Sequence, residues 1–153
     1  MSEKSKKFQK AFNSLLSYCQ YQERSSKEVA EKLWKFDLNP DEFDEIVNYL
    51  RDNSFFSDER FVENYVNSKL SKSWGRIKIK YHLRTKLDNN ELVEKALEKI
   101  DLEEYKNTIR ELIESKKRKL VKEQDSYKKK QKISLFLQNK GFEISFILDE
   151  LNK

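Results

Sequence analysis

The chain has 153 residues, of which 39% are charged and 37% hydrophobic, and its formal net charge is +5. That length fits one compact domain or a string of small modules, and no apolar run approaches the roughly 18 residues that a membrane span needs. The N-terminal MSEKSKKFQK lacks the apolar segment of a signal peptide, and the single cysteine, Cys19, excludes an internal disulfide. We therefore expect a cytoplasmic protein without a membrane segment.

The composition predicts an all-α fold. Only two glycines and one proline are present, which is too few turn formers for a sheet-rich protein. Ser25–Glu28 and Asp101–Glu104 have capping-box spacing, and Asn39 precedes Pro40 and two acidic residues, an order typical of a helix start. The helices are thus expected to begin at polar caps and to be joined by short polar connections.

An internal repeat underlies the apolar pattern. A shift of 50 residues places the apolar positions of residues 12–50 on those of residues 62–100, and the cap Asn39 on Asn89. A shift of 54 carries residues 79–97 onto 133–151, whereas residues 62–66 need a shift of 47 to reach 109–113. The difference indicates a seven-residue insertion in the third copy. A chance alignment of amphipathic helices is the alternative, but three helices match in order and with matched gaps.

Each copy is expected to contain three helices with apolar residues at i, i+3, i+4 and i+7. The chain is then three tandem three-helix repeats, residues 1–53, 54–100 and 101–153, with an extended first helix in the third. Such repeats are expected to form an elongated, curved right-handed or open helical array.

The charge is unevenly distributed. Residues 69–86 carry a net charge of +7, residues 115–132 carry +7, and residues 37–63 carry −7. The candidate binding residues are the basic side chains of the two positive blocks: Lys69, Lys72, Arg76, Lys78, Lys80, Arg84, Lys86, Lys116, Lys117, Arg118, Lys119, Lys128, Lys129 and Lys130.

Three interpretations of these blocks remain open. A basic block with Trp74 and Tyr81 interleaved could bind nucleic acid through its phosphates and bases, or it could be a solvated helix face. The two are evenly balanced for residues 69–86, and the solvated face is slightly favoured for residues 115–132, which offer only Tyr127 as an aromatic. An acidic protein surface is a third possible partner.

No catalytic, metal or cofactor site is expected. The two glycines, Gly75 and Gly141, are far apart in sequence and form no phosphate-binding loop. His82 and Cys19 are the only histidine and cysteine, so a metal site or a nucleophilic dyad would be hard to assemble. The acidic residues cluster at helix starts, where the helix dipole favours them. We expect a protein that is not an enzyme.

The order of several motifs resembles the RecX family of regulatory proteins, over residues 8–152. Phe56-Ser-Asp-Glu-Arg-Phe61 is followed by Tyr65-Val66, then by Trp74-Gly75-Arg76 and a basic helix, and Lys140-Gly141-Phe142 lies near the end. The residues that carry the resemblance, which we expect to be mainly structural, are Asp58, Arg60, Phe61, Tyr65, Trp74, Gly75, Leu83, Gly141 and Phe142.

The resemblance implies a specific function. RecX-like proteins are cytoplasmic regulators built of three-helix units that lie in the groove of the RecA–DNA filament, suppress ATP hydrolysis and strand exchange, and are not enzymes. It therefore implies a negative regulator of RecA in DNA repair and recombination, with RecA filaments and single- or double-stranded DNA as partners and no cofactor. Arg76, Lys80 and Arg84 lie one helical turn apart and are expected to face the filament or its DNA. We expect a monomer.

Two departures concern the turns. Members often have glycine between the middle and last helices, where this chain has Asp37 and Leu87 and only Gly141 matches; the common proline after the aromatic–glycine pair is Arg76. The alternatives to RecA regulation are a helical-repeat protein that binds DNA without RecA and an adaptor for an acidic protein partner.

Overall fold

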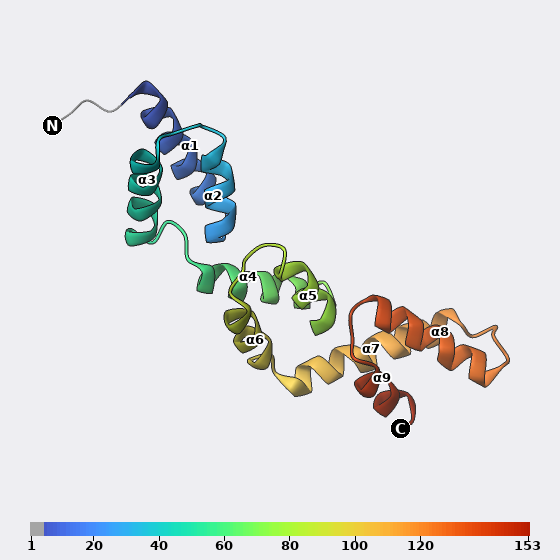
Figure 1. Ribbon diagram of the computed structural model, residues 1–153. Coiled ribbons are helices and arrows are strands. Elements are labelled where there is room, and N and C mark those ends of the chain that lie inside the picture. Colours follow the sequence, from blue (N-terminus) through green and yellow to red (C-terminus); the bar gives the residue numbers. More distant parts are fainter. Residues whose placement is uncertain (1–4) are drawn as a thin grey trace. The chain divides into compact units, whose positions relative to one another are not determined.

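The computed structural model describes residues 5–153, and every regular element in that part of the chain is an α-helix (Figure 1). The helices, in chain order, are α1 (Lys6–Tyr21), α2 (Ser26–Trp34), α3 (Pro40–Asp52), α4 (Asp58–Ser71), α5 (Arg76–Leu83), α6 (Asn90–Glu98), α7 (Leu102–Lys119), α8 (Ser126–Asn139) and α9 (Ile144–Leu151). The expected all-α fold is confirmed. None of these helices is both long enough and apolar enough to cross a membrane. The elongated, curved arrangement of the repeats stays a prediction.

The helices begin at the caps that the sequence predicted. Ser25 and Glu28 form a complete capping box, in which each side chain accepts a hydrogen bond from the other residue's backbone N–H, at 3.1 and 3.0 Å. Asn39, Asn89 and Asp101 each accept a hydrogen bond from the backbone N–H three residues later. These bonds satisfy N–H groups that the first turn of a helix leaves without an intrahelical acceptor.

The chain forms two compact units. The first runs to Tyr65 and includes Arg84–Leu92, and the second comprises Val66–Leu83 and Val93–Lys153. The division passes through α4, so the helices of the middle repeat are shared between the units. The expected repeat boundaries at residues 53 and 100 therefore stay a prediction.

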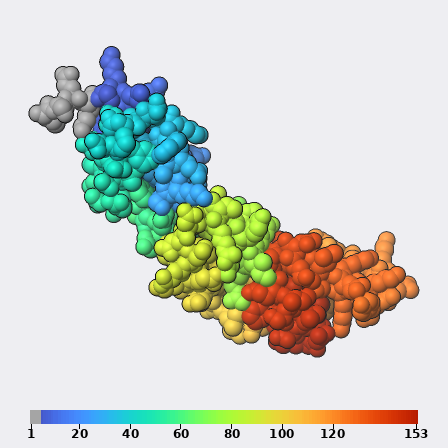
Figure 2. All heavy atoms as spheres, in the orientation of Figure 1, coloured from blue at the N-terminus to red at the C-terminus, as the bar shows by residue number. Residues whose placement is uncertain are grey.

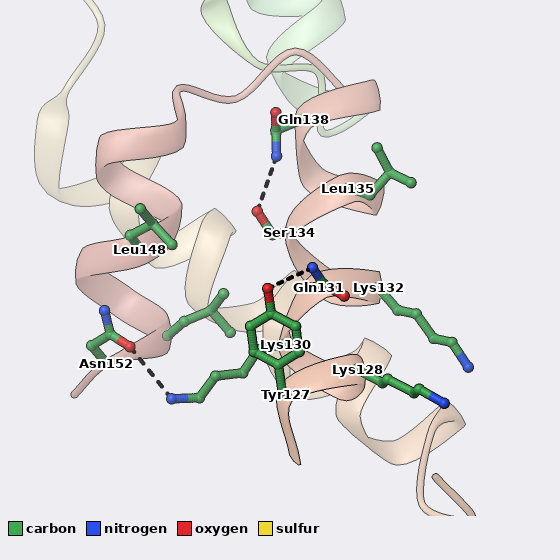
Figure 3. A pocket seen from close by; sticks show the side chains of 11 residues that line it. Tyr127, Lys128, Lys130, Gln131, Lys132, Ser134, Leu135, Gln138, Leu148 and Asn152 are labelled. Atoms are coloured by element: carbon green, nitrogen blue, oxygen red, sulfur yellow. Dashed lines mark hydrogen bonds between the residues drawn. The ribbon is translucent and has the colours of Figure 1, made fainter. Parts of the chain in front are cut away.

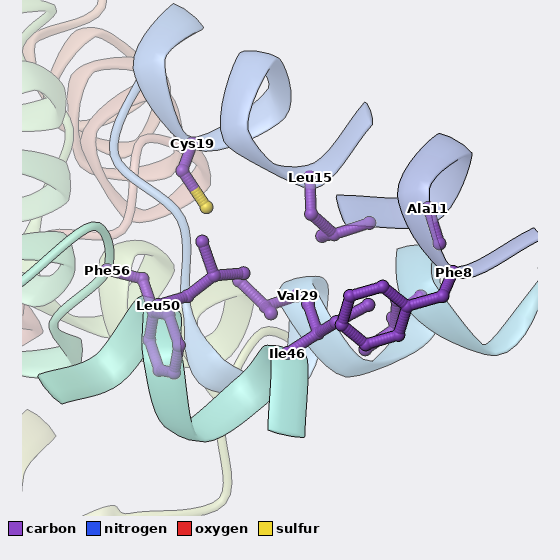
Figure 4. Packing of buried hydrophobic residues seen from close by; sticks show 9 residues of the cluster. Phe8, Ala11, Leu15, Cys19, Val29, Ile46, Leu50 and Phe56 are labelled. Atoms are coloured by element: carbon purple, nitrogen blue, oxygen red, sulfur yellow. The ribbon is translucent and has the colours of Figure 1, made fainter. Parts of the chain in front are cut away.

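In the first unit, α1, α2 and α3 enclose one apolar core (Figure 4). Its buried residues follow the helical spacing expected from the sequence: Phe8, Ala11, Leu15 and Cys19 on α1, Val29 and Leu33 on α2, and Ile46 and Leu50 on α3. Burial raises the pKa of the Cys19 thiol, which keeps it protonated. Cys19 is thus a packing residue of this core.

In the second unit, α7, α8 and α9 pack on one another in the same way. Tyr105, Ile109 and Ile113 of α7 are buried against Ile133 and Leu137 of α8 and the apolar face of α9. A polar contact reinforces this packing, because the Nε of Arg110 on α7 donates to the carboxylate of Glu150 on α9 at 2.9 Å. The Glu150 side chain is only 4% exposed.

The turns explain how the chain departs from the family's glycine pattern. Asp37 adopts a φ of 52° and Gly141 a φ of 94°, both in the left-handed region. Aspartate tolerates this conformation better than most residues, so it can replace glycine at the first turn. Leu87 has no positive φ and is 2% exposed, so the second turn is anchored by an apolar side chain instead.

The seven-residue insertion enlarges the hairpin between α7 and α8. α7 has 18 residues and exceeds α1 by two, so the first helix is only slightly extended. It ends at Lys119, and the C-cap residue Leu120 is partly buried against the core. α8 begins at Ser126, one helical turn earlier than the register of α5 requires, and has 14 residues against 8 in α5. Most of the insertion therefore lies in the turn and in the start of α8.

Replacing Glu150 with glutamine should lower stability at neutral pH but not in acid. Burial raises the pKa of Glu150, but the hydrogen bonds that its carboxylate accepts from Lys153 and Arg110 outweigh burial and hold the pKa below its ordinary value. A lowered folded-state pKa stabilises the fold above about pH 4.3, and this contribution is lost as the pH falls through the folded-state value. We expect Glu150→Gln to lower the free energy of unfolding by about 1 kcal/mol at neutral pH. The difference from the wild type should disappear in acid.

Thermal unfolding followed by circular dichroism at several pH values would measure this effect. Glu114→Gln is the control, because among residues 5–153 Glu114 forms an ion pair only with Lys117, at 3.5 Å, and its side chain is 62% exposed. A difference between wild type and Glu150→Gln that stayed constant down to pH 3 would contradict the assigned role of the carboxylate.

Candidate functional site

The two glycines of the chain meet in the second unit. The Gly75 N–H donates to the carbonyl of Lys140 at 2.7 Å, and the Ile77 N–H donates to the carbonyl of Gly141 at 3.0 Å. A Cβ on Gly75 would lie 2.2 Å from the carbonyl carbon and oxygen of Gly141, so only glycine fits without displacing the backbone. The start of α5 is thereby joined to the turn that follows α8.

Arg76, the next residue, enters a polar network at this contact. Its guanidinium pairs with the Glu143 carboxylate at 2.5 Å, and its backbone N–H donates to the Tyr105 hydroxyl at 2.8 Å. That hydroxyl in turn donates to Glu143 at 2.5 Å. The side chains of Arg76 and Glu143 are 26% and 23% exposed. Arg76 thus lies in a partly buried ion pair rather than on an open basic face.

Tyr105 serves this network as a neutral donor. Burial, followed by the hydrogen bond to Glu143, raises the pKa of Tyr105 well above its ordinary value. The hydroxyl therefore stays protonated and can accept from Arg76 while it donates to Glu143. Because Glu143 is engaged here, it makes no side-chain cap for α9, unlike Asn39 and Asn89 at the corresponding positions.

A second junction, within the first unit, uses the same positions of the repeat. Asp58 accepts hydrogen bonds from the N–H and the hydroxyl of Ser26 at 2.7 and 2.8 Å, and the Ser25 hydroxyl donates to the Lys86 carbonyl at 2.7 Å. Arg60 pairs with Glu23 at 3.0 Å. In both junctions, the start of a middle helix bonds to the first helix of the following repeat and to its middle turn.

The register of the repeat makes this correspondence explicit. A shift of 50 places Ser26 on Arg76, a shift of 47 places Asp58 on Tyr105, and a shift of 54 places Lys86 on Lys140. Sequence reasoning missed the contacts between repeats that Ser25, Ser26, Tyr105 and Glu143 make, although it predicted the cap role of Ser25. The repeat register alone does not reveal these contacts. It could have predicted one junction only after the structure of the other was known.

The other signature residues have packing roles. Phe61 is 6% exposed, Leu83 is fully buried and Phe142 is 1% exposed, while Tyr65 is half-buried. The Trp74 ring lies against His82, with a centroid distance of 5.1 Å. That these residues have a mainly structural role stays a prediction.

The basic block at residues 69–86 is not one free surface. The ammonium groups of Lys69 and Lys78 lie 4.6 and 4.1 Å from the centre of the Trp74 ring, and Lys80 is ion-paired with Glu94. Arg84 and Lys86 belong to the first unit, whereas the preceding residues belong to the second. Lys72 and Arg84 are exposed. Much of this charge is therefore held in local contacts.

Replacing Arg76 with glutamate would place a second carboxylate beside that of Glu143. Such a substitution would therefore disturb the network itself, as well as any contact of Arg76 with a filament. Whether Lys80 and Arg84 face a filament stays a prediction.

The basic block at residues 115–132 gathers at the α7–α8 hairpin (Figure 2). Lys116, Lys117, Arg118 and Lys119 occupy the last turn of α7, where a helix dipole favours positive charge. Lys128 and Lys129 instead lie in the first turn of α8, which contains no acidic residue. The dipole disfavours positive charge there, so helix stability does not explain these two lysines.

Among residues 5–153, no three histidine, cysteine, aspartate or glutamate side chains come together that could hold a metal ion. The basic residues that local contacts do not account for lie on the α7–α8 hairpin and on the exposed part of the first basic block, at Lys72 and Arg84.

The order of the repeats can be compared with known domains. Residues 11–50, 57–97 and 103–149 match the domains described as the first, second and third three-helix domains of RecX, in that order. The chain belongs to the RecX family. All three domains of a RecX protein are thus present in tandem, as the sequence predicted.

Curated relatives and a solved structure agree. Regulatory protein RecX from Clostridium perfringens (strain 13 / Type A) is 33% identical over 141 residues, which cover 92% of this chain and 66% of the relative. Regulatory protein RecX from Clostridium acetobutylicum is 30% identical over 142 residues, which cover 89% and 66%. The crystal structure of RecX from Lactobacillus salivarius has a TM-score of 0.85 at 29% identity, covering 95% of this chain and 97% of that chain. The chain thus spans 66% of the length of these clostridial RecX proteins.

Replacing Gly75 with alanine should destabilise this RecX chain. The new methyl group would overlap the Gly141 carbonyl and force the backbone apart, at an expected cost of about 1–3 kcal/mol in the free energy of unfolding. Urea denaturation followed by circular dichroism would measure it. Lys72→Ala is the control, because Lys72 is exposed and lies just before the same turn. If Gly75→Ala and wild type unfolded at the same urea concentration, the glycine contact would have no role in stability.

Proposed function

We propose that the chain is a negative regulator of RecA, acting in the control of DNA repair and recombination. On this proposal it binds in the groove of the RecA–DNA filament and lowers ATP hydrolysis and strand exchange, without catalysing a reaction of its own. The observation that carries the proposal is the match of all three RecX domains, in order, over most of the chain. The name regulatory protein RecX, given to its relatives, supports it.

The basic α7–α8 hairpin supports a contact with the DNA of the filament. Arg118, Lys119 and Lys128 are exposed, and none of them has an ion pair with another residue in the described part of the chain. Exposed cations without carboxylate partners can neutralise phosphates and release their counterions. We assign the phosphate contact mainly to this hairpin, with Lys72 and Arg84 as further candidates from the first basic block.

The ATPase rate of RecA on single-stranded DNA tests the proposed function. With RecA from the same organism, we expect the rate to fall as the protein is added, at amounts well below one molecule per RecA, because a filament regulator acts on the assembly. Bovine serum albumin at the same concentration controls for nonspecific effects. No fall at any ratio would exclude regulation of RecA ATPase activity.

The double substitution Lys128→Glu with Lys129→Glu tests the hairpin. It should weaken the effect on RecA severalfold by replacing two phosphate contacts with repulsion, and it should leave the melting temperature equal or higher, because acidic residues suit the first turn of a helix. The ATPase titration and a thermal melt measure the two effects. Lys10→Glu with Lys35→Glu makes the same change of net charge at exposed positions outside both basic blocks. If the control weakened the effect equally, only net charge would matter and the hairpin assignment would be wrong.

A DNA-binding protein that acts without RecA is the second candidate, and the hairpin charge favours it. It predicts tight binding to bare DNA whose affinity falls steeply with salt. Weak binding at moderate salt, together with inhibition of RecA, would favour the filament regulator.

A further inference from the structure

A groove of about 690 Å³ follows the exposed side of α8 and reaches α9 (Figure 3). Three lysines, three side-chain amides, a serine, a tyrosine and three leucines line it, and no carboxylate does. Positive charge, an aromatic ring and amide groups in one groove match the chemistry of a nucleic-acid strand: phosphates, flat bases and base edges.

Tyr127 offers an accessible ring in this groove. The residue is 70% exposed, and its hydroxyl accepts a hydrogen bond from the Gln131 amide at 3.0 Å. A similar bond joins the Gln138 amide to the Ser134 hydroxyl at 3.0 Å. Figure 3 shows these side chains in a row along α8, between Leu148 and Leu135. The bonds restrain the side chains before any ligand binds, which lowers the entropy cost of binding.

Comparison of the repeats indicates that this surface is not required by the fold. A shift of 54 residues relates the third repeat to the second, and a further shift of 50 relates the second to the first. Together they place three groove positions of the third repeat on three acidic residues of the first. Lys132, Leu135 and Leu148 correspond to Glu28, Glu31 and Asp44. The three-helix fold therefore accepts carboxylates at these positions, and the third repeat lacks them. Leu135 and Leu148 are 60% and 44% exposed, so core packing does not explain the difference.

The start of the groove also comes from the insertion in the third repeat. Tyr127 and Lys128 lie in the extra first turn of α8, before the position that corresponds to the start of α5. The insertion thus adds an exposed ring and a cation at one end of the groove. Two nearby carboxylates are already occupied: Asp125 caps α8, and Glu123 pairs with Lys132 at 2.9 Å.

We propose that this groove binds single-stranded nucleic acid, with a base stacked on Tyr127 and phosphates on Lys128 and Lys130. The Gln131 and Gln138 carbonyl oxygens can accept hydrogen bonds from base edges. Tyr127 to Gln138 spans about 16 Å of helix, roughly the length of four or five stacked nucleotides. The proposal deepens the hairpin contact described above but does not require RecA, because the groove belongs to this chain alone.

Binding of a fluorescein-labelled oligothymidylate of twenty nucleotides to the full chain, measured by anisotropy at low salt, tests the proposal. Tyr127→Ala should weaken binding roughly 5- to 150-fold, the range for loss of one stacked base. Tyr127→Phe keeps the ring and should bind close to the wild type. Leu148→Asp introduces the residue that the first repeat carries at this position, so it should fold normally and weaken binding by repulsion.

Two tyrosines provide matched controls. Tyr21→Ala removes a ring that is 82% exposed on α1 and should not change affinity. Tyr81→Ala removes a ring that is 71% exposed on α5, within the first basic block. If Tyr81→Ala weakened binding and Tyr127→Ala did not, the strand would bind to the first basic block and the groove proposal would be wrong.

Two other outcomes would also overturn the proposal. One is no detectable binding of the oligonucleotide at low salt. The other combines two observations: a duplex of equal length displaces the strand, and all groove variants bind the strand with the affinity of the wild type. That result would indicate that the strand is held by phosphate contacts elsewhere on the chain. The RecA ATPase titration separates this inference from the proposed function: a Tyr127→Ala chain that loses DNA binding but still inhibits RecA refutes the groove's role in regulation, not the regulation itself.

Discussion

The main-chain contact between Gly75 and Gly141 is the constraint on which the second unit depends. It leaves no room for a side chain on Gly75, and its two hydrogen bonds fix the start of α5 against the turn after α8. Once that turn is fixed, Arg76 lies within reach of Glu143 and Tyr105, and the network among them is satisfied. The position of α9 follows, because Glu143 is the residue that precedes it.

The two junctions solve one problem with different chemistry. A middle helix begins with N–H groups that need acceptors, and in each junction the first helix of the next repeat supplies one. The Asp58 carboxylate does so for Ser26, and the Tyr105 hydroxyl does so for Arg76. The junction residues thus connect neighbouring repeats, which separates residues that build the molecule from residues that are free to meet a partner.

Local features of the sequence predicted most of the fold, because caps such as Asn39 and core positions such as Leu15 depend on neighbours within one or two helical turns. The junctions could not be predicted in this way. Arg76 and Glu143 are 67 residues apart, and each has an ordinary local explanation as a helix-face cation or a helix-start acid. For the same reason, charge alone did not distinguish Arg76, which is paired with Glu143, from the exposed Lys128. The position of Lys128 in the first turn of α8 became known only with the bounds of that helix.

The hydrogen bonds of Gly75 and Ile77 join main chain to main chain, so they constrain the evolution of the side chains around them very little. Substitutions on the outer faces of the helices do not remove those bonds, so the surface of one repeat can drift without loosening its connection to the next. Duplicated modules that start out alike can then diverge in what they bind while remaining one assembly. The groove of α8, which has no carboxylate in its lining where the first repeat has acidic residues at three equivalent positions, is the outcome that such freedom permits.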